Sequence, residues 1–419
     1  MRSFKSQKVR KFNRKSLIVA LDVGKRVHYG YFRAPNGSEV ESFKVCNTKR
    51  SFNDFWYKVR QFARAHGLEQ IVVGFESSGP YAEPLCHFLK DKPVQLVQVN
   101  PMHTKRVKEL TGNSPNKTDR KDPRVIADVI ALGHTLTVVI PQQAAAELRR
   151  LSHGRQRAIK KRTAAVNQLG DLIFILFPEF NTIIKDIACQ SAFYLFRHYP
   201  RPEDLAVTDA QLLAQALCKV SRGRIGTEHV QRLINAARRS VGISQGTESI
   251  VLELQQLIRE IQFHDEFIGH IEQQMQHKLE QIPYSGVILS IRGIGVVTVA
   301  GLIGEVGDFR QFNTIAELIK LAGLDLYEIS SGQHRGRRRI SKRGRPLLRK
   351  LLFFAALNTI KAGGIMHGQY QQMLQRGMVK IKALTAISRK LLAVIFALVR
   401  DNSVYVENHC QIHELKRAA

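Results

Sequence analysis

Four carboxylates stand at positions where a strongly basic chain could hold a metal ion. Asp22 ends the apolar run SLIVALD, and Glu76 ends the apolar run IVVGFE. Asp119 and Asp122 lie three residues apart in NKTDRKDP, so a helix would place both on one face. Mg²⁺ prefers several oxygen ligands in a compact site, and a metal relieves the repulsion between like charges. The four acids are therefore a candidate magnesium site for chemistry on a phosphodiester.

Each acid alone has a plainer explanation. An aspartate after a strand is often a turn residue, and Glu76 could cap the helix that follows it. Asp119 and Asp122 could complement the dipole of a helix start, where Pro123 is tolerated in the first turn. Asp128 comes six residues after Asp122 and is expected to point elsewhere, with a structural role. The order of the four acids on one strand-and-helix segment favours the metal site.

The segment ISSGQHRGRRRISKRGRPLLRK, residues 329–350, is a second candidate for chemistry. After its first six residues it contains nine Lys or Arg residues and no acid. Ser330 and Ser331 precede a glycine, where a hydroxyl could be presented. A serine becomes a nucleophile only when a base, a metal or surrounding cations activate it. On the residues alone, both serines are best explained as turn residues, and Ser341 as a residue that positions the next helix or a phosphate.

Several other positions are candidates for contact with phosphates. Gly293 and Gly295 form a tight turn between two helical segments, and main-chain N–H groups at the start of a helix can bind a phosphate oxygen. A plain helix-turn-helix corner is the alternative explanation of this turn. The candidate nucleic-acid-binding residues are Gly293, Gly295, Arg155, Lys160, Lys161, Arg335, Arg337, Arg338, Arg339, Lys342, Arg343, Arg345 and Arg349.

The composition favours a partner that is a polyanion. The chain has 419 residues, 44% of them hydrophobic, and a formal net charge of +29. Nucleic acid is the leading candidate partner, and a membrane surface is a weaker one. No apolar run approaches the roughly 18 residues of a spanning helix, and no signal sequence is evident. The five cysteines are scattered without metal-ligand spacing, which indicates reduced thiols in a cytosolic protein.

The first half of the chain predicts an α/β domain. A basic arm covers residues 1–15, and residues 16–142 alternate apolar strand-like runs with amphipathic helical segments. The predicted helix from Ser51 to His66, for example, has its aromatic residues on one face. We therefore expect a mixed sheet with helices packed against it.

The rest of the chain predicts helices. Residues 143–282 read as a linker, with a basic helix first, short helices from 183 to 247, and a heptad pattern from Ile250 to Ile282. The heptads predict a coiled coil or a long antiparallel helix pair, in which His264 or Asp265 fills the missing apolar position. An ordinary amphipathic helix is the alternative. Residues 283–404 predict a largely helical domain, and residues 405–419 a polar tail.

Taken together, these parts resemble the transposases of the IS110 group of bacterial insertion sequences. The amino-terminal motifs are ALDVGKRVHYG, VVGFESSGPY and NKTDRKDPRVIADV. The carboxy-terminal motifs are IRGIGVVTVAGLIGEVGDFRQF and SSGQHRGRRRISKRGRPLLRKLLFFAA. The resemblance covers almost the whole chain. The run GQHRGRRR departs from the Gly-Gly-Lys type of run that is more common in the family.

The resemblance implies a RuvC-like first domain and a mostly helical transposase domain with a helix-hairpin-helix-like element. It implies that Asp22, Glu76, Asp119 and Asp122 bind Mg²⁺, and that Ser331, or Ser330 if the alignment shifts by one residue, attacks DNA to form a phosphoserine link. It also implies a bridge RNA that selects donor and target DNA, and dimers that assemble into a tetramer in the bacterial cytoplasm, at the nucleoid when bound to DNA. A metal-dependent nuclease or junction resolvase without serine chemistry, and an inactive nucleic-acid-binding protein, are the alternatives.

Overall fold

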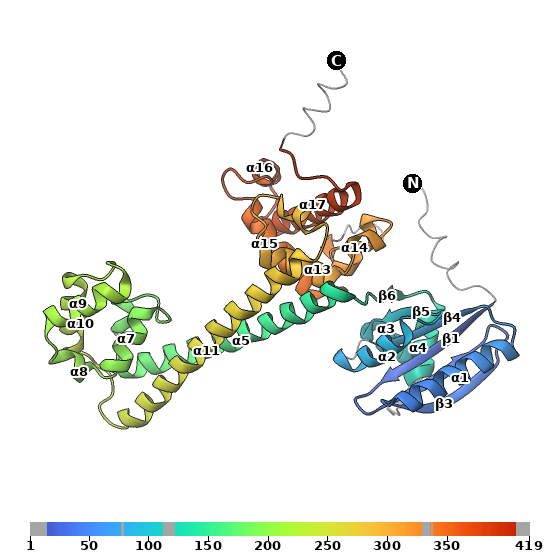
Figure 1. Cartoon of the computed structure of the whole chain (residues 1–419), viewed down its shortest axis with the longest axis horizontal. Helices are drawn as coiled ribbons and strands as arrows, with labels where there is room; N and C mark the ends of the chain where they lie inside the picture. The colour runs from blue at the N-terminus through green and yellow to red at the C-terminus, as the bar shows by residue number, and fades with distance from the viewer. Residues whose placement is uncertain (1–14, 77–78, 112–121, 329–335, 337, 408–419) are drawn as a thin grey trace, which may run out of the picture. The chain divides into compact units, whose positions relative to one another are not determined.

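The computed structural model describes residues 15–76, 79–111, 122–328, 336 and 338–407 (Figure 1). The chain divides into two compact units. The first unit contains residues 1–146 together with residues 305–419, and the second contains residues 147–304. No helix in the described ranges combines the length and apolar character that crossing a membrane requires.

A six-stranded mixed sheet forms the centre of the amino-terminal part, with the strand order β3-β2-β1-β4-β5-β6. Strand β1 pairs in parallel with β4, and β4 in parallel with β5, whereas β2, β3 and β6 run antiparallel to their neighbours. The strands are β1 (Ser16–Val23), β2 (Val27–Arg33), β3 (Glu39–Cys46), β4 (Gln70–Glu76), β5 (Gln95–Val99) and β6 (Thr135–Thr137). The predicted α/β class and mixed sheet are confirmed, and β6 is a strand that the sequence pattern did not reveal.

Helices cover both faces of this sheet because residues along a strand alternate between its faces. Leu17, Val19 and Leu21 of β1 share a core with helices α1 (Lys49–Ala65) and α2 (Glu83–Leu89), which the short helix η2 (Gly79–Ala82) precedes. The alternate residues Ile18 and Ala20 share a second core with α4 (Asp122–Ala131). Helix α3 (Pro101–Thr111) follows β5 directly. The even-numbered residues of β1 therefore face α4.

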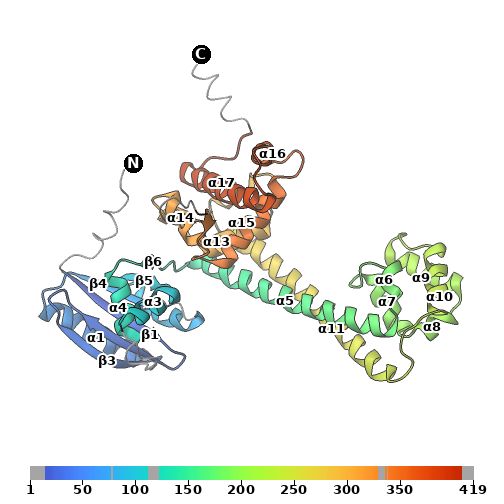
Figure 2. The ribbon, with the colours of Figure 1, turned by 180° about the vertical axis from the view of Figure 1, so that it is seen from behind.

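The second unit is built on two long helices, α5 (Gln143–Leu176) and α11 (Thr247–Glu280), which lie side by side in Figures 1 and 2. Arg155 on α5 pairs with Glu272 on α11 at 2.6 Å, and Arg162 pairs with Asp265. The later of the two residues on α5, Arg162, pairs with the earlier of the two residues on α11, Asp265. The two helices therefore run antiparallel. The two helices form a long antiparallel pair, which was one of the predicted arrangements. Asp265 is exposed and pairs with Arg162, whereas the His264 side chain is half-buried.

Five short helices pack against one end of this pair. Their core includes apolar residues from the second half of α5 and the first half of α11. They are α6 (Phe180–Ile183), α7 (Gln190–His198), α8 (Pro202–Ala206), α9 (Ala210–Ser221) and α10 (Thr227–Ala237). The unit ends with α12 (Ser285–Leu289) and most of α13 (Val296–Val306).

The carboxy-terminal part of the first unit is mostly helical, as predicted. Its buried helix α17 carries Ile387, Leu391 and Ile395 with no exposed surface. The elements are η3 (Phe309–Gln311), α14 (Ile315–Ala322), β7 (Leu326–Tyr327), β8 (Arg339–Ile340), α15 (Pro346–Thr359), α16 (His367–Gln375) and α17 (Lys380–Asp401). Strands β7 and β8 form a separate antiparallel pair.

Candidate active site

Two of the predicted acids lie at neighbouring strand ends. Leu21 of β1 pairs in register with Phe75 of β4, and Asp22 and Glu76 follow directly in these parallel strands. Both acids are even-numbered, so they share the sheet face of Ala20 and Val72, which is the face that α4 covers. Each side chain is half-buried. Alternation along the two strands thus brings two carboxylates to the same edge and the same face of the sheet.

Helix α4 begins at a third predicted acid. Asp122 is its first residue and only 17% of its side chain is exposed, while Pro123 lies in the first turn as predicted. The helix packs closely on β4 at Gly74, where an added Cβ would lie 2.9 Å from Val97 Cγ2 and closer still to Ile130 Cδ1. Asp122 therefore lies at the start of the helix that covers the sheet face of Asp22 and Glu76. Asp119 lies outside the described residues.

The donor chemistry of this site fits a hard cation. Asp22, Glu76 and Asp122 offer carboxylate oxygens, which Mg²⁺ prefers over nitrogen or sulfur. Within the described ranges, no three His, Cys, Asp or Glu side chains are grouped closely enough to hold a metal. The oxygen donors fit the predicted ion in kind, and binding would require these carboxylates to draw together with Asp119.

Helix α3 contacts two of the acids through residues that were not among the predicted site residues. Thr104 Oγ1 donates a hydrogen bond to Glu76 Oε2 at 2.9 Å, and Lys108 Nζ forms an ion pair with Asp122 Oδ1. Thr104 and Lys108 are four residues apart, so they lie on one face of α3. The sequence contained one indication of these contacts. Helix α3 directly follows β5, and Val99 at the carboxyl end of β5 pairs with Glu76 at the end of β4.

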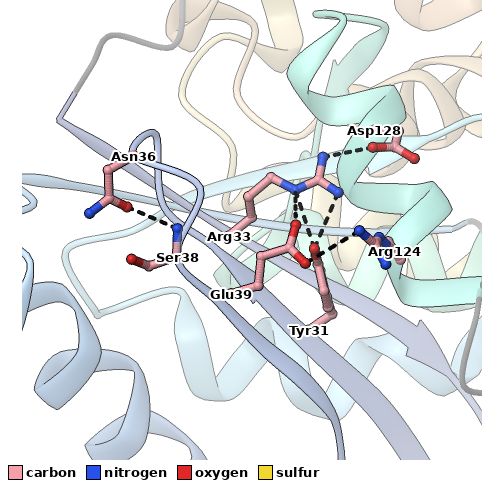
Figure 3. A network of polar contacts seen from close by, with 7 residues as sticks. All are labelled: Tyr31, Arg33, Asn36, Ser38, Glu39, Arg124 and Asp128. Carbon is pink, nitrogen blue, oxygen red and sulfur yellow. Dashed lines mark hydrogen bonds and ion pairs between the residues drawn. The ribbon is translucent and has the colours of Figure 1, made fainter.

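A polar network joins α4 to strands β2 and β3 of the sheet (Figure 3). Arg33 at the end of β2 pairs with Asp128 of α4 at 2.6 Å and with Glu39 of β3 at 3.3 Å. The hydroxyl of Tyr31 accepts hydrogen bonds from the Arg33 guanidinium, and Arg124 of α4 approaches Glu39 at 3.5 Å. The expected structural role of Asp128, away from the acidic site, is confirmed.

The pKa shifts of Arg33 and Glu39 in this network favour the charged form of each side chain. Burial alone would lower the pKa of Arg33, but hydrogen bonds with Asp128 and Tyr31 outweigh burial and raise it. The hydrogen bond from Tyr31 lowers the pKa of the Glu39 carboxyl, and burial raises the pKa of the Tyr31 phenol. Near neutral pH, Arg33 and Glu39 are therefore charged and paired, which holds β2, β3 and α4 together.

Replacing Asp128 with asparagine should loosen this attachment of α4. The Arg33 and Asp128 side chains are only 21% and 30% exposed, so loss of the charge leaves a half-buried guanidinium without its strongest partner. We expect the free energy of unfolding to fall by about 1–3 kcal/mol, measured by urea denaturation at neutral pH. Asp91→Asn, at an exposed turn position, is the matched control and should change stability by less than about 0.5 kcal/mol. Equal effects of the two changes would contradict a role for the network.

The predicted serine segment lies between β7 and β8. Leu326 pairs with Ile340, and Tyr327 with Arg339, so β7 and β8 are the two strands of a β-hairpin. Ser330 and Ser331 themselves lie outside the described residues. The described flanks are joined by an ion pair between Glu328 and Arg338 at 2.9 Å. The structure therefore describes the two strands, β7 and β8, that flank the serine segment in the chain.

The base of this hairpin is fixed by main-chain contacts. Ser341 N–H donates to the Asp325 carbonyl oxygen at 2.8 Å, and its hydroxyl donates to the Asp325 carboxylate. Gly344 lies against the end of α14: an added Cβ would lie 2.7 Å from the Lys320 carbonyl oxygen and closer still to the Leu321 carbonyl oxygen and the Gly323 nitrogen. Only a residue without a side chain permits this approach.

The predicted phosphate-contacting cations fall into two groups. Arg155 pairs with Glu272, the Arg345 guanidinium donates to the carbonyl oxygens of Glu305 and Val139, and Arg349 donates to that of Ala322. Burial also lowers the pKa of Arg349. These three side chains are half-buried and have structural partners, and among the exposed cations Arg338 pairs with Glu328 and Arg343 lies 3.0 Å from His103 Nε2. The exposed cations are Lys160, Lys161, Arg338, Arg339, Lys342 and Arg343, whereas Arg335 and Arg337 lie outside the described residues.

The predicted glycine turn lies between α12 and α13, as expected. Gly293 has a φ of 94°, a left-handed conformation that favours glycine. An added Cβ at Gly295 would meet nothing within 4 Å. A side chain at position 295 would therefore meet no steric obstacle, and phosphate contact at this turn stays a prediction.

Comparisons with known proteins identify both halves of the chain. Residues 19–178 match a family model for DEDD transposases of the IS110 type, described as a transposase. Residues 285–371 match a second model, described as the transposase IS116/IS110/IS902 family. The first match contains the acidic positions, and the second contains the glycine turn and the serine segment.

Whole proteins give the same result. The chain is 25% identical to the insertion element IS110 uncharacterized 43.6 kDa protein of Streptomyces coelicolor, over 93% of this chain and 95% of that protein. It is 24% identical to the insertion element IS116 uncharacterized 44.8 kDa protein of Streptomyces clavuligerus, over 92% and 95%. It is also 24% identical to the transposase for insertion sequence element IS1111A of Coxiella burnetii, over 75% and 73%. The matches run through both units in the same order, and the chain belongs to the IS110 family of transposases.

Proposed function

We propose that this transposase cuts and rejoins donor and target DNA through a covalent phosphoserine intermediate. The observation that carries the proposal is the placement of Asp22, Glu76 and Asp122 on elements that meet at one face of the sheet. Acids there do not help a strongly basic protein bind DNA, whereas they could hold the divalent cation that phosphodiester chemistry often uses. The amino-terminal domain is, in this proposal, RuvC-like.

In the proposed reaction, the hydroxyl oxygen of Ser331 forms a bond to the scissile phosphorus, and the bond from phosphorus to the leaving deoxyribose oxygen breaks. The serine proton is lost, and the leaving oxygen gains a proton and becomes a free hydroxyl. Mg²⁺ held by Asp22, Glu76, Asp119 and Asp122 would supply positive charge to the scissile phosphate. The cations of the serine segment stabilise the charge that develops on the phosphoryl group. Because the linkage keeps the phosphodiester energy, the reverse step rejoins strands without ATP.

A structured bridge RNA would select the DNA in this proposal. The net charge of +29 suits a protein that contacts nucleic-acid backbones while base pairing supplies sequence choice. The exposed lysines Lys160 and Lys161 and the open glycine turn at Gly295 are candidate backbone contacts. Exposed apolar side chains on α11, including Phe263 and Phe267, support assembly of dimers into a tetramer.

Trapping the covalent intermediate tests the proposed chemistry. The full-length protein, the RNA that co-purifies with it and end-labelled DNA are incubated with Mg²⁺ and then denatured. We expect a labelled protein–DNA adduct that survives denaturation, with a free hydroxyl on the opposite DNA end. Cleaved DNA without any adduct would instead support the alternative function, a metal-dependent nuclease or junction resolvase that uses water.

Sequencing the co-purifying RNA tests the guide. A single abundant structured RNA, encoded beside the gene, is the expected result. A random sample of cellular RNA would contradict RNA guidance and would leave the covalent chemistry to be decided by the adduct experiment.

A further inference from the structure

Lys108 touches the acidic site from an element that no motif of the sequence marks. Its ammonium pairs with Asp122 Oδ1, while Thr104, one turn earlier on α3, donates to Glu76 Oε2 at 2.9 Å. Thr104 is buried, and its single hydroxyl hydrogen is shared between Glu76 Oε2 and the Pro101 carbonyl oxygen, which lies at 2.8 Å. The contact with Glu76 therefore anchors α3 at the sheet edge and fixes the position from which Lys108 reaches Asp122.

The two partners of this ion pair differ in their access to water. The Asp122 side chain is 17% exposed, and the Lys108 side chain is 38% exposed. A shielded carboxylate depends on a nearby positive charge, since removal of its partner leaves a charge with little solvation. Lys108 has a long, flexible side chain and its ammonium can return to water. The ion pair can therefore open by movement of the lysine while Asp122 keeps its place at the start of α4.

A divalent cation would require the same carboxylate. Mg²⁺ binds carboxylate oxygens directly, and an ammonium at the Asp122 carboxylate both occupies an oxygen and repels a second cation. We propose that Lys108 is a positioning residue that competes with the divalent cation for Asp122, so that cation binding releases Lys108 from the carboxylate. This inference rests on the proposed function of the acidic residues as ligands, and it assigns Lys108 a part in setting the affinity of that site.

The test measures cation binding by the full-length protein, independently of DNA cleavage. Isothermal titration calorimetry with Mg²⁺ and with Mn²⁺, at low ionic strength and without nucleic acid, compares the wild type with Lys108→Met. The methionine keeps an unbranched side chain of similar length and removes the charge. We expect Lys108→Met to bind both cations about tenfold more tightly, because repulsion by one nearby positive charge is removed.

Matched variants separate competition from a general loss of charge. Lys105→Met removes the same charge from an exposed position of α3 and should bind like the wild type. Lys108→Arg keeps the positive charge and should retain wild-type affinity within about twofold. When Asp122 is already asparagine, Lys108→Met should produce no gain, because the contested carboxylate is absent. Circular dichroism and thermal melting in EDTA verify that each variant is folded.

The outcomes distinguish the inference from the proposed function. If Asp122→Asn weakens cation binding but Lys108→Met leaves it unchanged or weakens it, the competition is wrong and the acidic site stands. An equal gain in Lys105→Met would also overturn the inference, because the effect would then be general electrostatics. If Asp122→Asn leaves binding unchanged, the cation binds elsewhere, and both the proposed ligand role of Asp122 and the competition fail.

Discussion

Ser331→Ala should abolish the covalent protein–DNA adduct. We expect the adduct yield to fall by at least about 10⁴-fold, so that any remaining adduct is below detection. The physical reason is that the adduct requires an oxygen that can bond to phosphorus, and alanine has none. The cations around the segment remain, so DNA binding should be nearly unchanged. The measurement is denaturing electrophoresis of end-labelled DNA after incubation with protein, co-purified RNA and Mg²⁺, together with a filter-binding assay of DNA affinity.

Ser330→Ala is the neighbouring control and should keep the adduct. The reverse pattern, with the adduct lost only in Ser330→Ala, would move the nucleophile by one residue. Asp22→Asn should also abolish the adduct, because a carboxylate ligand is lost, while the protein keeps its fold. DNA cleavage that continues in Ser331→Ala and stops in Asp22→Asn would contradict the phosphoserine mechanism and support hydrolysis by the acidic site.

The acidic face could be predicted from the sequence because strand geometry is local. The apolar runs before Asp22 and Glu76 identify two strands, and alternation in β1 and β4 then decides which face each acid occupies. Asp122 was placed at a helix start by Pro123, which is tolerated in the first turn. The heptads of α11 similarly predicted a long helix with a partner, since a repeating apolar seam must be buried.

The contacts of α3 could not be predicted, because they depend on where separate elements meet. Nothing in the spacing of Lys108 and Asp122, 14 residues apart in the chain, indicates that the start of α4 returns to the side of α3. The ion pair between Arg33 and Asp128 likewise joins residues 95 positions apart. Side-chain partners of this kind follow from the tertiary packing of the sheet and its helices. The local sequence pattern does not predict them.

The base of the serine hairpin shows the same limit. A glycine between Arg343 and Arg345 reads as one more flexible position in a basic run. The structure instead shows a close approach of two main chains: Lys342 N–H donates to the Gly323 carbonyl oxygen at 3.0 Å, and Arg345 N–H donates to that of Leu321 at 2.7 Å. Gly344 lies between these two hydrogen bonds. The glycine permits the close contact between the two main chains. Gly344 does not have a positive φ, so backbone conformation does not explain why a glycine is present here.

Gly344→Ala should therefore have a large effect on both stability and activity. The new Cβ would collide with main-chain atoms of Lys320, Leu321 and Gly323, which cannot move aside as a side chain could. We expect the free energy of unfolding to fall by about 2–4 kcal/mol, because one of the two main-chain segments must shift. Adduct formation should fall at least about 100-fold, because β8 and the serine segment would lose their fixed support.

The measurements are urea denaturation and the adduct assay, with Gly368→Ala as the matched control. Gly368 lies in the first turn of α16, where an added Cβ meets nothing within 4 Å, so the same chemical change should leave stability unchanged or slightly raised. Adduct formation in this control should equal that of the wild type. A Gly344→Ala protein with wild-type stability and adduct yield would show that the contact between the α14 end and the hairpin base does not position the serine segment.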